Sequence, residues 1–135
     1  MRRWMNVTIA ILALILGGFL YAVLRQNTYI AAFFSETQTV ISLRKVFSGI
    51  EWQMASYYLP DFLWGLALSC SLIAIFEPSK AGCGCCALTG MLCGIAWEVL
   101  QAFWIVSGTG DMWDVLMYAC AAAIAFLINI KERRK

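Results

Sequence analysis

The sequence predicts an all-α, polytopic membrane protein with four transmembrane helices, and three observations lead to this fold class. Of the 135 residues, 62% are hydrophobic and only 13% are charged, whereas about 25% of residues are charged in globular proteins. The apolar residues gather in four runs, 5–24, 59–76, 83–106 and 112–130, each near the length that crosses a bilayer as a helix. Charged residues lie mainly at the ends of these runs. We therefore expect a single membrane domain over residues 1–135.

Composition also excludes several classes of function. The chain has no histidine, which excludes imidazole catalysis, His-based pH sensing and zinc sites built on His. The net charge of +2 forms no basic patch, so no nucleic-acid partner is expected. Among the six cysteines, Cys83, Cys85 and Cys86 cluster without a second ligand pair. This pattern favours small-residue packing or palmitoylation over metal binding, and we expect no cofactor and no metal.

The first predicted span, 5–24, follows Arg2 and Arg3, which we interpret as an anchor on the inner side. The next interval, 25–58, is the most polar of the chain, but apolar residues recur in it at helical spacing. This pattern predicts an extracytoplasmic interfacial helix between the first and second spans. A short re-entrant or cap helix is the alternative, and the sequence leaves both open.

The second predicted span, 59–76, opens with Pro60 and Asp61. Proline suits the first turn of a helix, and an aspartate there interacts favourably with the helix dipole, so one interpretation of Asp61 is an N-terminal cap. Gly65 and Ser69 follow Asp61 at steps of four. One face of this helix is therefore predicted to be small and polar.

The third predicted span, 83–106, carries the most informative spacing. A row of small residues at intervals of four leads to Glu98 through Gly82, Cys86, Gly90 and Gly94. Small residues in such a row let neighbouring helices approach closely. Glu98 is therefore predicted to face protein instead of lipid.

The fourth predicted span, 112–130, follows a short glycine-rich turn at 107–110. Thr109 or Asp111 can cap its start. One helical face is formed by Asp114, Tyr118, Ala122, Ala125 and Asn129. Its small residues predict a second closely packed surface.

The orientation follows from the distribution of Lys and Arg. With the N-terminus inside, the inner side holds Arg2, Arg3, Lys80, Lys131, Arg133, Arg134 and Lys135, and the outer side holds Arg25, Arg44 and Lys45. Seven basic residues against three predict that both termini lie in the cytoplasm.

This topology predicts that scattered acidic residues converge in the outer half of the bundle. They are Asp61, Glu98, Gln101, Asp111 and Asp114, with Glu98 roughly 12 Å from the outer end of its span. Ionisable groups at membrane depth usually mark functional sites. Four carboxyls this close are not expected to ionise together, so at least one, Glu98 first, is predicted to be protonated or hydrogen-bonded. The alternative is structural: Glu98 and Gln101 bridge helices, while Asp61 and Asp111 cap them.

Aromatic residues are predicted near the same outer boundary, namely Trp52, Tyr57, Tyr58, Trp64, Trp104 and Trp113. Amphipathic rings favour the depth of the lipid headgroups, so we interpret most of them as interface anchors. The functional alternative is a platform for lipid or sugar groups beside the carboxylates.

The third and fourth spans resemble the VanZ-like family of small bacterial membrane proteins. The resemblance lies in the E-x-x-Q pair, Glu98 and Gln101, followed by a short turn and the G-T-x-D-x-x-D motif with Asp111 and Asp114. It covers chiefly residues 57–126. An arginine before the aspartates and an Asn-x-x-Gly further on, both frequent in that family, are absent here. The resemblance implies a multi-pass protein of the bacterial cytoplasmic membrane that affects how envelope lipids or teicoplanin interact at the surface.

Three functions are therefore left open. The first is a non-enzymatic membrane protein whose outward-facing acidic pocket binds a cationic or polyhydroxylated envelope ligand, a glycopeptide or a partner. The second is an enzyme that acts on a lipid-linked envelope substrate through paired carboxylates or a divalent metal. The third is a small proton-coupled transporter subunit, which with four spans would require a homo-oligomer. Membrane lipids are partners in every case.

Overall fold

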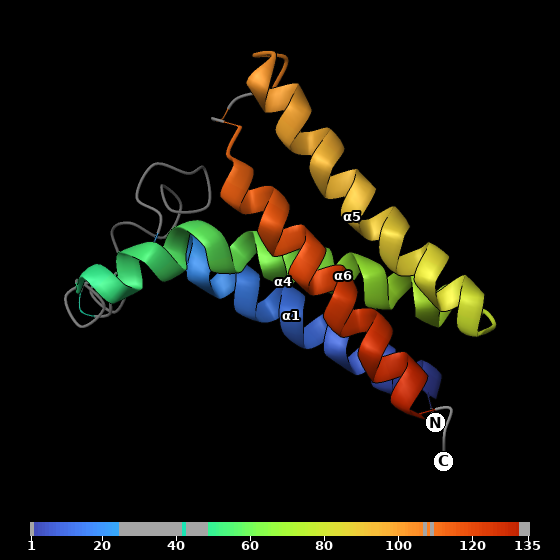
Figure 1. The fold of residues 1–135 in the computed structure, drawn as a ribbon. Coiled ribbons are helices and arrows are strands. Elements are labelled where there is room, and N and C mark those ends of the chain that lie inside the picture. Colours follow the sequence, from blue (N-terminus) through green and yellow to red (C-terminus); the bar gives the residue numbers. More distant parts are fainter. Residues whose placement is uncertain (1, 25–41, 43–48, 107, 109, 133–135) are drawn as a thin grey trace.

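A computed structural model describes residues 2–24, 42, 49–106, 108 and 110–132. It contains the helices α1 (Arg2–Leu24), α4 (Ile50–Phe76), α5 (Lys80–Ala102) and α6 (Met112–Glu132), labelled as in Figure 1. Each of these helices includes a stretch that is long and apolar enough to cross a membrane. The prediction of an all-α protein with four helices that can cross a membrane is confirmed for the described residues.

Helix α4 is the centre of the bundle. It packs against α1, α5 and α6, and α5 and α6 also pack against each other. Helix α1 packs closely on α4 but makes few or no close backbone approaches to α5 and α6. The start of α1 and the end of α6 lie near each other, so the two ends of the described chain meet at one end of the bundle (Figure 1).

The start of α4 differs from the prediction. The helix begins at Ile50, so Pro60 lies inside it and not in its first turn. Proline inside a helix removes one backbone hydrogen bond, yet Leu59 before it and Asp61 after it are both helical. The predicted interfacial helix falls largely on residues 25–41 and 43–48, outside the described residues. From Ile50 onwards its predicted range belongs to α4, so no separate helix is found there.

The turn between α4 and α5 begins where the second span was predicted to end, after residue 76, but α5 begins at Lys80, three residues before the predicted start of the third span. Glu77 ends α4 in the left-handed conformation, with φ 44°, and its N–H donates to the Ile73 carbonyl at 3.1 Å. Ser79 then caps α5, because its side-chain oxygen accepts a hydrogen bond from the Gly82 N–H at 3.3 Å. Such caps satisfy backbone groups that a helix end leaves without partners.

Helix α5 ends earlier than predicted, at Ala102 instead of Val106. The chain then folds back in a turn in which the N–H of Ile105 and the N–H of Val106 both donate to the Leu100 carbonyl, at 3.0 and 3.4 Å. Trp104 has a positive φ of 59°, a conformation uncommon outside glycine. The apolar run does continue to residue 106, but its last turn is not helical.

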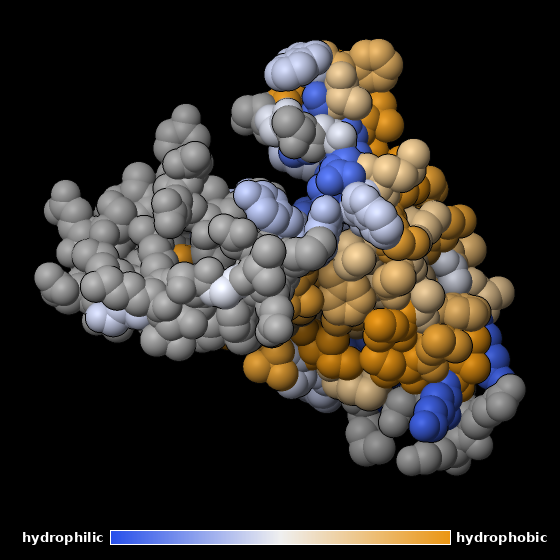
Figure 2. All heavy atoms as spheres, turned by 60° about the vertical axis from the view of Figure 1, so that its left-hand side comes forward, coloured by the Kyte–Doolittle hydropathy of each residue, from blue (hydrophilic) through white to orange (hydrophobic). Residues whose placement is uncertain are grey.

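The interior of the bundle is built mainly from small residues, with Leu63, Ile73 and Tyr118 among the larger buried side chains, while many large apolar side chains point outwards. Fully buried positions include Ala67, Cys70, Cys83, Ala121 and Ala125. Exposed apolar side chains include Leu12, Ile15, Ile75, Leu88 and Leu127. Figure 2 shows an apolar surface between hydrophilic residues at two ends of the molecule. This is the distribution expected of a membrane bundle, in which lipid replaces water around the middle.

Asn6 and Asn129 join α1 to α6 inside the bundle. Both residues are fully buried, and each amide group donates to the oxygen of the other, at 2.8 Å from Asn6 and 3.0 Å from Asn129. The same amide groups donate to the Arg2 and Ala125 carbonyls, at 2.9 and 2.8 Å. We call this pair the asparagine clasp.

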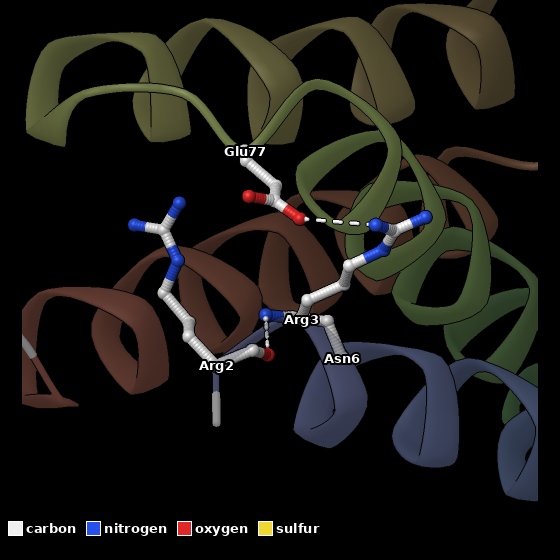
Figure 3. A network of polar contacts seen from close by, with 4 residues as sticks. All are labelled: Arg2, Arg3, Asn6 and Glu77. Carbon is white, nitrogen blue, oxygen red and sulfur yellow. Dashed lines mark hydrogen bonds and ion pairs between the residues drawn. The ribbon is translucent and has the colours of Figure 1, made fainter.

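Basic residues surround the clasp at this end of the bundle. Arg3 forms an ion pair with Glu77 at 3.5 Å (Figure 3). Arg2 donates to the Pro78 carbonyl at 3.0 Å and so ties the start of α1 to the turn between α4 and α5. Positively charged ends of this kind are typical of the cytoplasmic side.

Candidate functional site

A polar cavity of about 230 Å³ opens between α1, α4, α5 and α6 at the end of the bundle opposite the asparagine clasp. All five residues predicted to converge line it: Asp61, Glu98, Gln101, Asp111 and Asp114. The other lining residues are Tyr21, Tyr57, Tyr58, Trp97 and Gly108. We call this cavity the acidic pocket. The predicted convergence is observed, although the residues come from three helices and a turn.

Asp61 lies in the middle of α4 and accepts a hydrogen bond from the Tyr118 hydroxyl of α6 at 2.9 Å. It is therefore not the helix cap that one interpretation of the sequence proposed. The ring of Tyr118 reaches this position between two glycines. A Cβ added to Gly94 would lie 2.3 Å from the ring, and one added to Gly65 would lie 3.0 Å from it. The small-residue faces of α4 and α5 thus create the slot that holds Tyr118 and aims its hydroxyl at Asp61.

Glu98 is buried, with 5% of its surface exposed, and it faces the bundle as the glycine row predicts. Its Oε2 accepts a hydrogen bond from the backbone N–H of Asp111 at 3.1 Å. The expectation that Glu98 is protonated or hydrogen-bonded is therefore met by a hydrogen bond. Gly110 makes this contact possible, because a Cβ there would lie 2.8 Å from the Glu98 carbonyl oxygen.

Asp111 caps α6, one of the two candidates for that position. Its Oδ1 accepts a hydrogen bond from the Trp113 N–H at 3.0 Å. Asp114 follows in the first turn of the same helix. Both carboxyl groups therefore sit at the positive end of the α6 dipole, which stabilises negative charge.

Gln101 lies against the turn between α5 and α6. Gly108 has φ 141°, a value that side-chain-bearing residues rarely adopt. A Cβ at Gly108 would lie 2.5 Å from Gln101 Nε2, so the amide fits directly over the glycine. A larger residue at 108 would displace Gln101 from the pocket wall.

Among the described residues, the polar groups that line the acidic pocket are all acidic or neutral. Four carboxyl groups line it, and none of the described residues that line it is Lys or Arg. Carboxylates and the Gln101 carbonyl accept hydrogen bonds from hydroxyls and amines. The site is thus suited to a cationic or hydroxyl-rich group and unsuited to a free anion.

Aromatic side chains complete the wall, and two of them were not anticipated from the sequence. Tyr57 and Tyr58 lie where the sequence predicted boundary aromatics, and the Tyr58 ring lies 6.5 Å from that of Trp113. Tyr21 and Trp97 were missed. The sequence marks them only by position: Tyr21 lies near the end of the first apolar run, and Trp97 directly precedes Glu98.

The remaining aromatic predictions divide into two groups. Trp64, Trp104 and Trp113 are 61%, 84% and 59% exposed, as expected of rings at a membrane surface. Trp52 belongs to α4, but its side chain lies outside the described part of the structure.

The cysteine cluster is divided by burial. Cys83 is fully buried, Cys86 is half-buried and Cys85 is exposed. Within the described ranges, no three Asp, Glu, Cys or His side chains are grouped closely enough to hold a metal ion. Cys83 instead lies beside Arg2, whose guanidinium is 3.7 Å from the Cys83 sulfur.

Comparison of this chain with protein-family models, curated proteins and solved structures found no match. The functional argument therefore depends on the geometry of the acidic pocket and on the motif that Glu98, Gln101, Asp111 and Asp114 form.

Proposed function

We propose that this chain is a VanZ-like, non-enzymatic membrane protein that binds an amine-bearing or polyhydroxylated group of an envelope lipid or glycopeptide in its acidic pocket. The observation that carries the proposal is the convergence of Asp61, Glu98, Gln101, Asp111 and Asp114 on one cavity without a basic side chain among its described lining. The four residues of the E-x-x-Q and D-x-x-D motifs all belong to this set.

The chemistry of the wall supports a cationic or hydroxyl-rich ligand. Tyr21, Tyr57, Tyr58 and Trp97 line the same cavity as the carboxyl groups. Aromatic faces attract ammonium groups and stack on sugars, and the attraction is worth about 0.5–2 kcal/mol. The volume of about 230 Å³ is below the roughly 300–1,000 Å³ of sites for whole drug-sized molecules. It therefore suits a headgroup or a single sugar.

The location follows from the charge distribution. The acidic pocket lies at the end of the bundle opposite Arg2, Arg3, Lys80 and Lys131. The positive-inside rule then supports a protein of the bacterial cytoplasmic membrane with both termini in the cytoplasm and the pocket facing outwards. A ligand would approach from the envelope side.

No specific observation favours either of the two alternatives, the membrane enzyme or the proton-coupled transporter subunit. The enzyme requires a nucleophile, a metal or a carboxylate pair set on a substrate, and the described residues form no metal-binding group. The transporter requires a path across the bundle, whereas Cys70, Ile73, Ala125 and the two residues of the asparagine clasp are fully buried in the interior.

Two measurements test the proposal: binding of small headgroup-like molecules to the protein, and the teicoplanin susceptibility of cells that express it. Ethanolamine and glucose, as headgroup-sized probes, are measured against the protein in nanodiscs, with Glu98→Gln as the variant. We expect binding of ethanolamine to fall about tenfold on loss of the charge, equivalent to roughly 1.4 kcal/mol. Expression in a teicoplanin-sensitive bacterium should change susceptibility, and Glu98→Gln or Asp111→Asn should reverse that change. No binding of either probe and no change in susceptibility would remove the proposal.

A further inference from the structure

A second hollow adjoins the acidic pocket on the side of the bundle. It measures about 520 Å³ and lies between α1, α4 and α5, with Tyr118 of α6 at its inner wall. Its lining is mostly apolar. Tyr21, Asp61 and Trp97 line both this hollow and the acidic pocket. The two cavities therefore share a wall at these three residues, and we call the larger one the apolar groove.

The groove is hollow because many of the residues that line it have no side chain. Five of its lining residues are glycines: Gly17, Gly18, Gly65, Gly90 and Gly94. A Cβ at Gly18 would meet nothing within 4 Å, so this position borders open space. Helices α1 and α5 both pack on α4 but not closely on each other. Helix α4 thus forms the floor of the groove, and α1 and α5 form its sides.

The surroundings of the groove favour a hydrocarbon occupant. Its walls are stretches of α1, α4 and α5 that are apolar and long enough to span a membrane. Ordered water needs two to four polar partners, and an apolar wall does not provide them. An empty space beside lipid would forfeit van der Waals contacts along its whole lining. A flexible chain from the bilayer restores these contacts.

The shared residues indicate how the groove and the pocket are used together. We propose that the groove holds the hydrocarbon chain of the same membrane amphiphile whose amine- or hydroxyl-bearing headgroup occupies the acidic pocket. This inference rests on the proposed function and adds the class of ligand. Asp61, with its bond from Tyr118, and the amphipathic ring of Trp97 lie where headgroup and chain meet. The ligand enters sideways from the bilayer, between α1 and α5.

The test uses two photoreactive amphiphiles with the same chain. One is a long-chain primary amine with a diazirine at mid-chain, and the other is the matched fatty acid, each added to the full chain in phosphatidylcholine nanodiscs. We expect the amine to label peptides from Gly17–Tyr21 and Gly90–Trp97 about tenfold more than the acid does. Gly18→Leu fills open space and should lower this labelling about tenfold without changing the binding of ethanolamine.

The matched control is Ala123→Leu, which adds similar bulk to an exposed position of α6 away from both cavities. It should leave labelling unchanged. Equal labelling by amine and acid, no effect of Gly18→Leu, or crosslinking of α1 or α5 to a second copy of the chain would overturn the inference.

Glu98→Gln separates failure of this inference from failure of the proposed function. If the variant lowers ethanolamine binding while Gly18→Leu has no effect on labelling, the pocket binds headgroups and the groove inference alone is wrong. If neither ethanolamine nor glucose binds the unaltered chain, teicoplanin susceptibility does not change, and amine and acid label equally, both proposals are wrong.

Discussion

The two polar ends of the bundle are built in opposite ways. At the asparagine clasp, two buried amides satisfy each other and two backbone carbonyls, with every partner supplied by the protein. At the acidic pocket, Glu98 and Asp61 also accept hydrogen bonds from the protein, but the carboxyls surround a cavity of about 230 Å³. The first arrangement is closed and the second has room for another molecule.

The difference shows how polar residues inside a membrane can be sorted. Interhelical hydrogen bonds in membranes contribute modestly to stability, about 0.6 kcal/mol on average. The two neutral amides of Asn6 and Asn129 hydrogen-bond each other. Joining α1 to α6 is therefore a sufficient reason for their presence in the interior. Several carboxyls gathered around a cavity are costly, and stability alone does not account for them. Four variants test this division, beginning with the largest effect.

Gly94→Val should remove the slot on which the acidic pocket depends. A Cβ at this position would lie 2.3 Å from the Tyr118 ring, so the ring and Asp61 must separate. Overpacking usually costs about 1–3 kcal/mol, and we expect about 3 kcal/mol together with loss of ethanolamine binding. Thermal unfolding in detergent and binding in nanodiscs measure both. Gly18→Ala is the matched control, and an equal loss in that variant would show that glycine replacement as such is responsible.

Asn129→Leu should destabilise the bundle without affecting the pocket. It leaves the buried Asn6 amide without its partner, at a cost of about 1–2 kcal/mol. The double variant Asn6→Leu with Asn129→Leu should recover most of this loss, because two apolar side chains leave no unsatisfied group. A double-mutant cycle on unfolding free energies tests the coupling. Reduced ethanolamine binding in Asn129→Leu would contradict the division between the two ends.

Tyr118→Phe removes one hydroxyl and keeps the ring. The bond to Asp61 at 2.9 Å is lost, which should cost about 1 kcal/mol of stability. Because the Tyr118 hydroxyl then no longer holds the Asp61 carboxyl group in place, we expect weaker binding of amine-headed ligands as well. Unfolding and ethanolamine binding are compared with Tyr58→Phe, whose ring also lines the pocket. Unchanged binding in Tyr118→Phe would show that Asp61 needs no positioning.

Arg3→Ala should have the smallest effect. Its ion pair with Glu77 is exposed, with 65% and 54% of the two side chains accessible, and exposed pairs contribute about 0–1 kcal/mol. We expect a change in unfolding free energy below about 0.5 kcal/mol and no change in ligand binding. Arg2→Ala is the comparison, because it also loses the bond to the Pro78 carbonyl. A larger loss of unfolding free energy for Arg3→Ala than for Arg2→Ala would show that the ion pair with Glu77 stabilises this end of the bundle more than the hydrogen bond to the Pro78 carbonyl does.

Much of the fold and of the pocket was predictable from the sequence because both depend on local patterns. Apolar runs specify the helices, and the glycine row on α5 gives Glu98 its direction. The start of α4 was predicted wrongly, because Pro60 is usual at the first turn of a helix but lies within this one. The end of α5 was wrong for a related reason: an apolar sequence does not reveal where the backbone leaves the helix.

Contacts between distant residues were the least predictable. Asn6 and Asn129 are 123 positions apart, and a polar residue in an apolar run carries no sign of its partner. Tyr21 and Trp97 join the pocket only because α1 and α5 flank α4. The asparagine clasp and these two pocket residues follow from tertiary arrangement, which single-sequence patterns do not contain.

The asparagine clasp also has a consequence for biogenesis. Asn6 emerges from the ribosome long before Asn129, so the first span is inserted while its amide still lacks the partner that it has in the finished bundle. Until α6 is in place, the Asn6 side chain can keep its hydrogen bond to the Arg2 carbonyl, but it lacks the two bonds that it shares with Asn129. A chain that stops before α6 would therefore leave the Asn6 side-chain oxygen without the donor that Asn129 supplies.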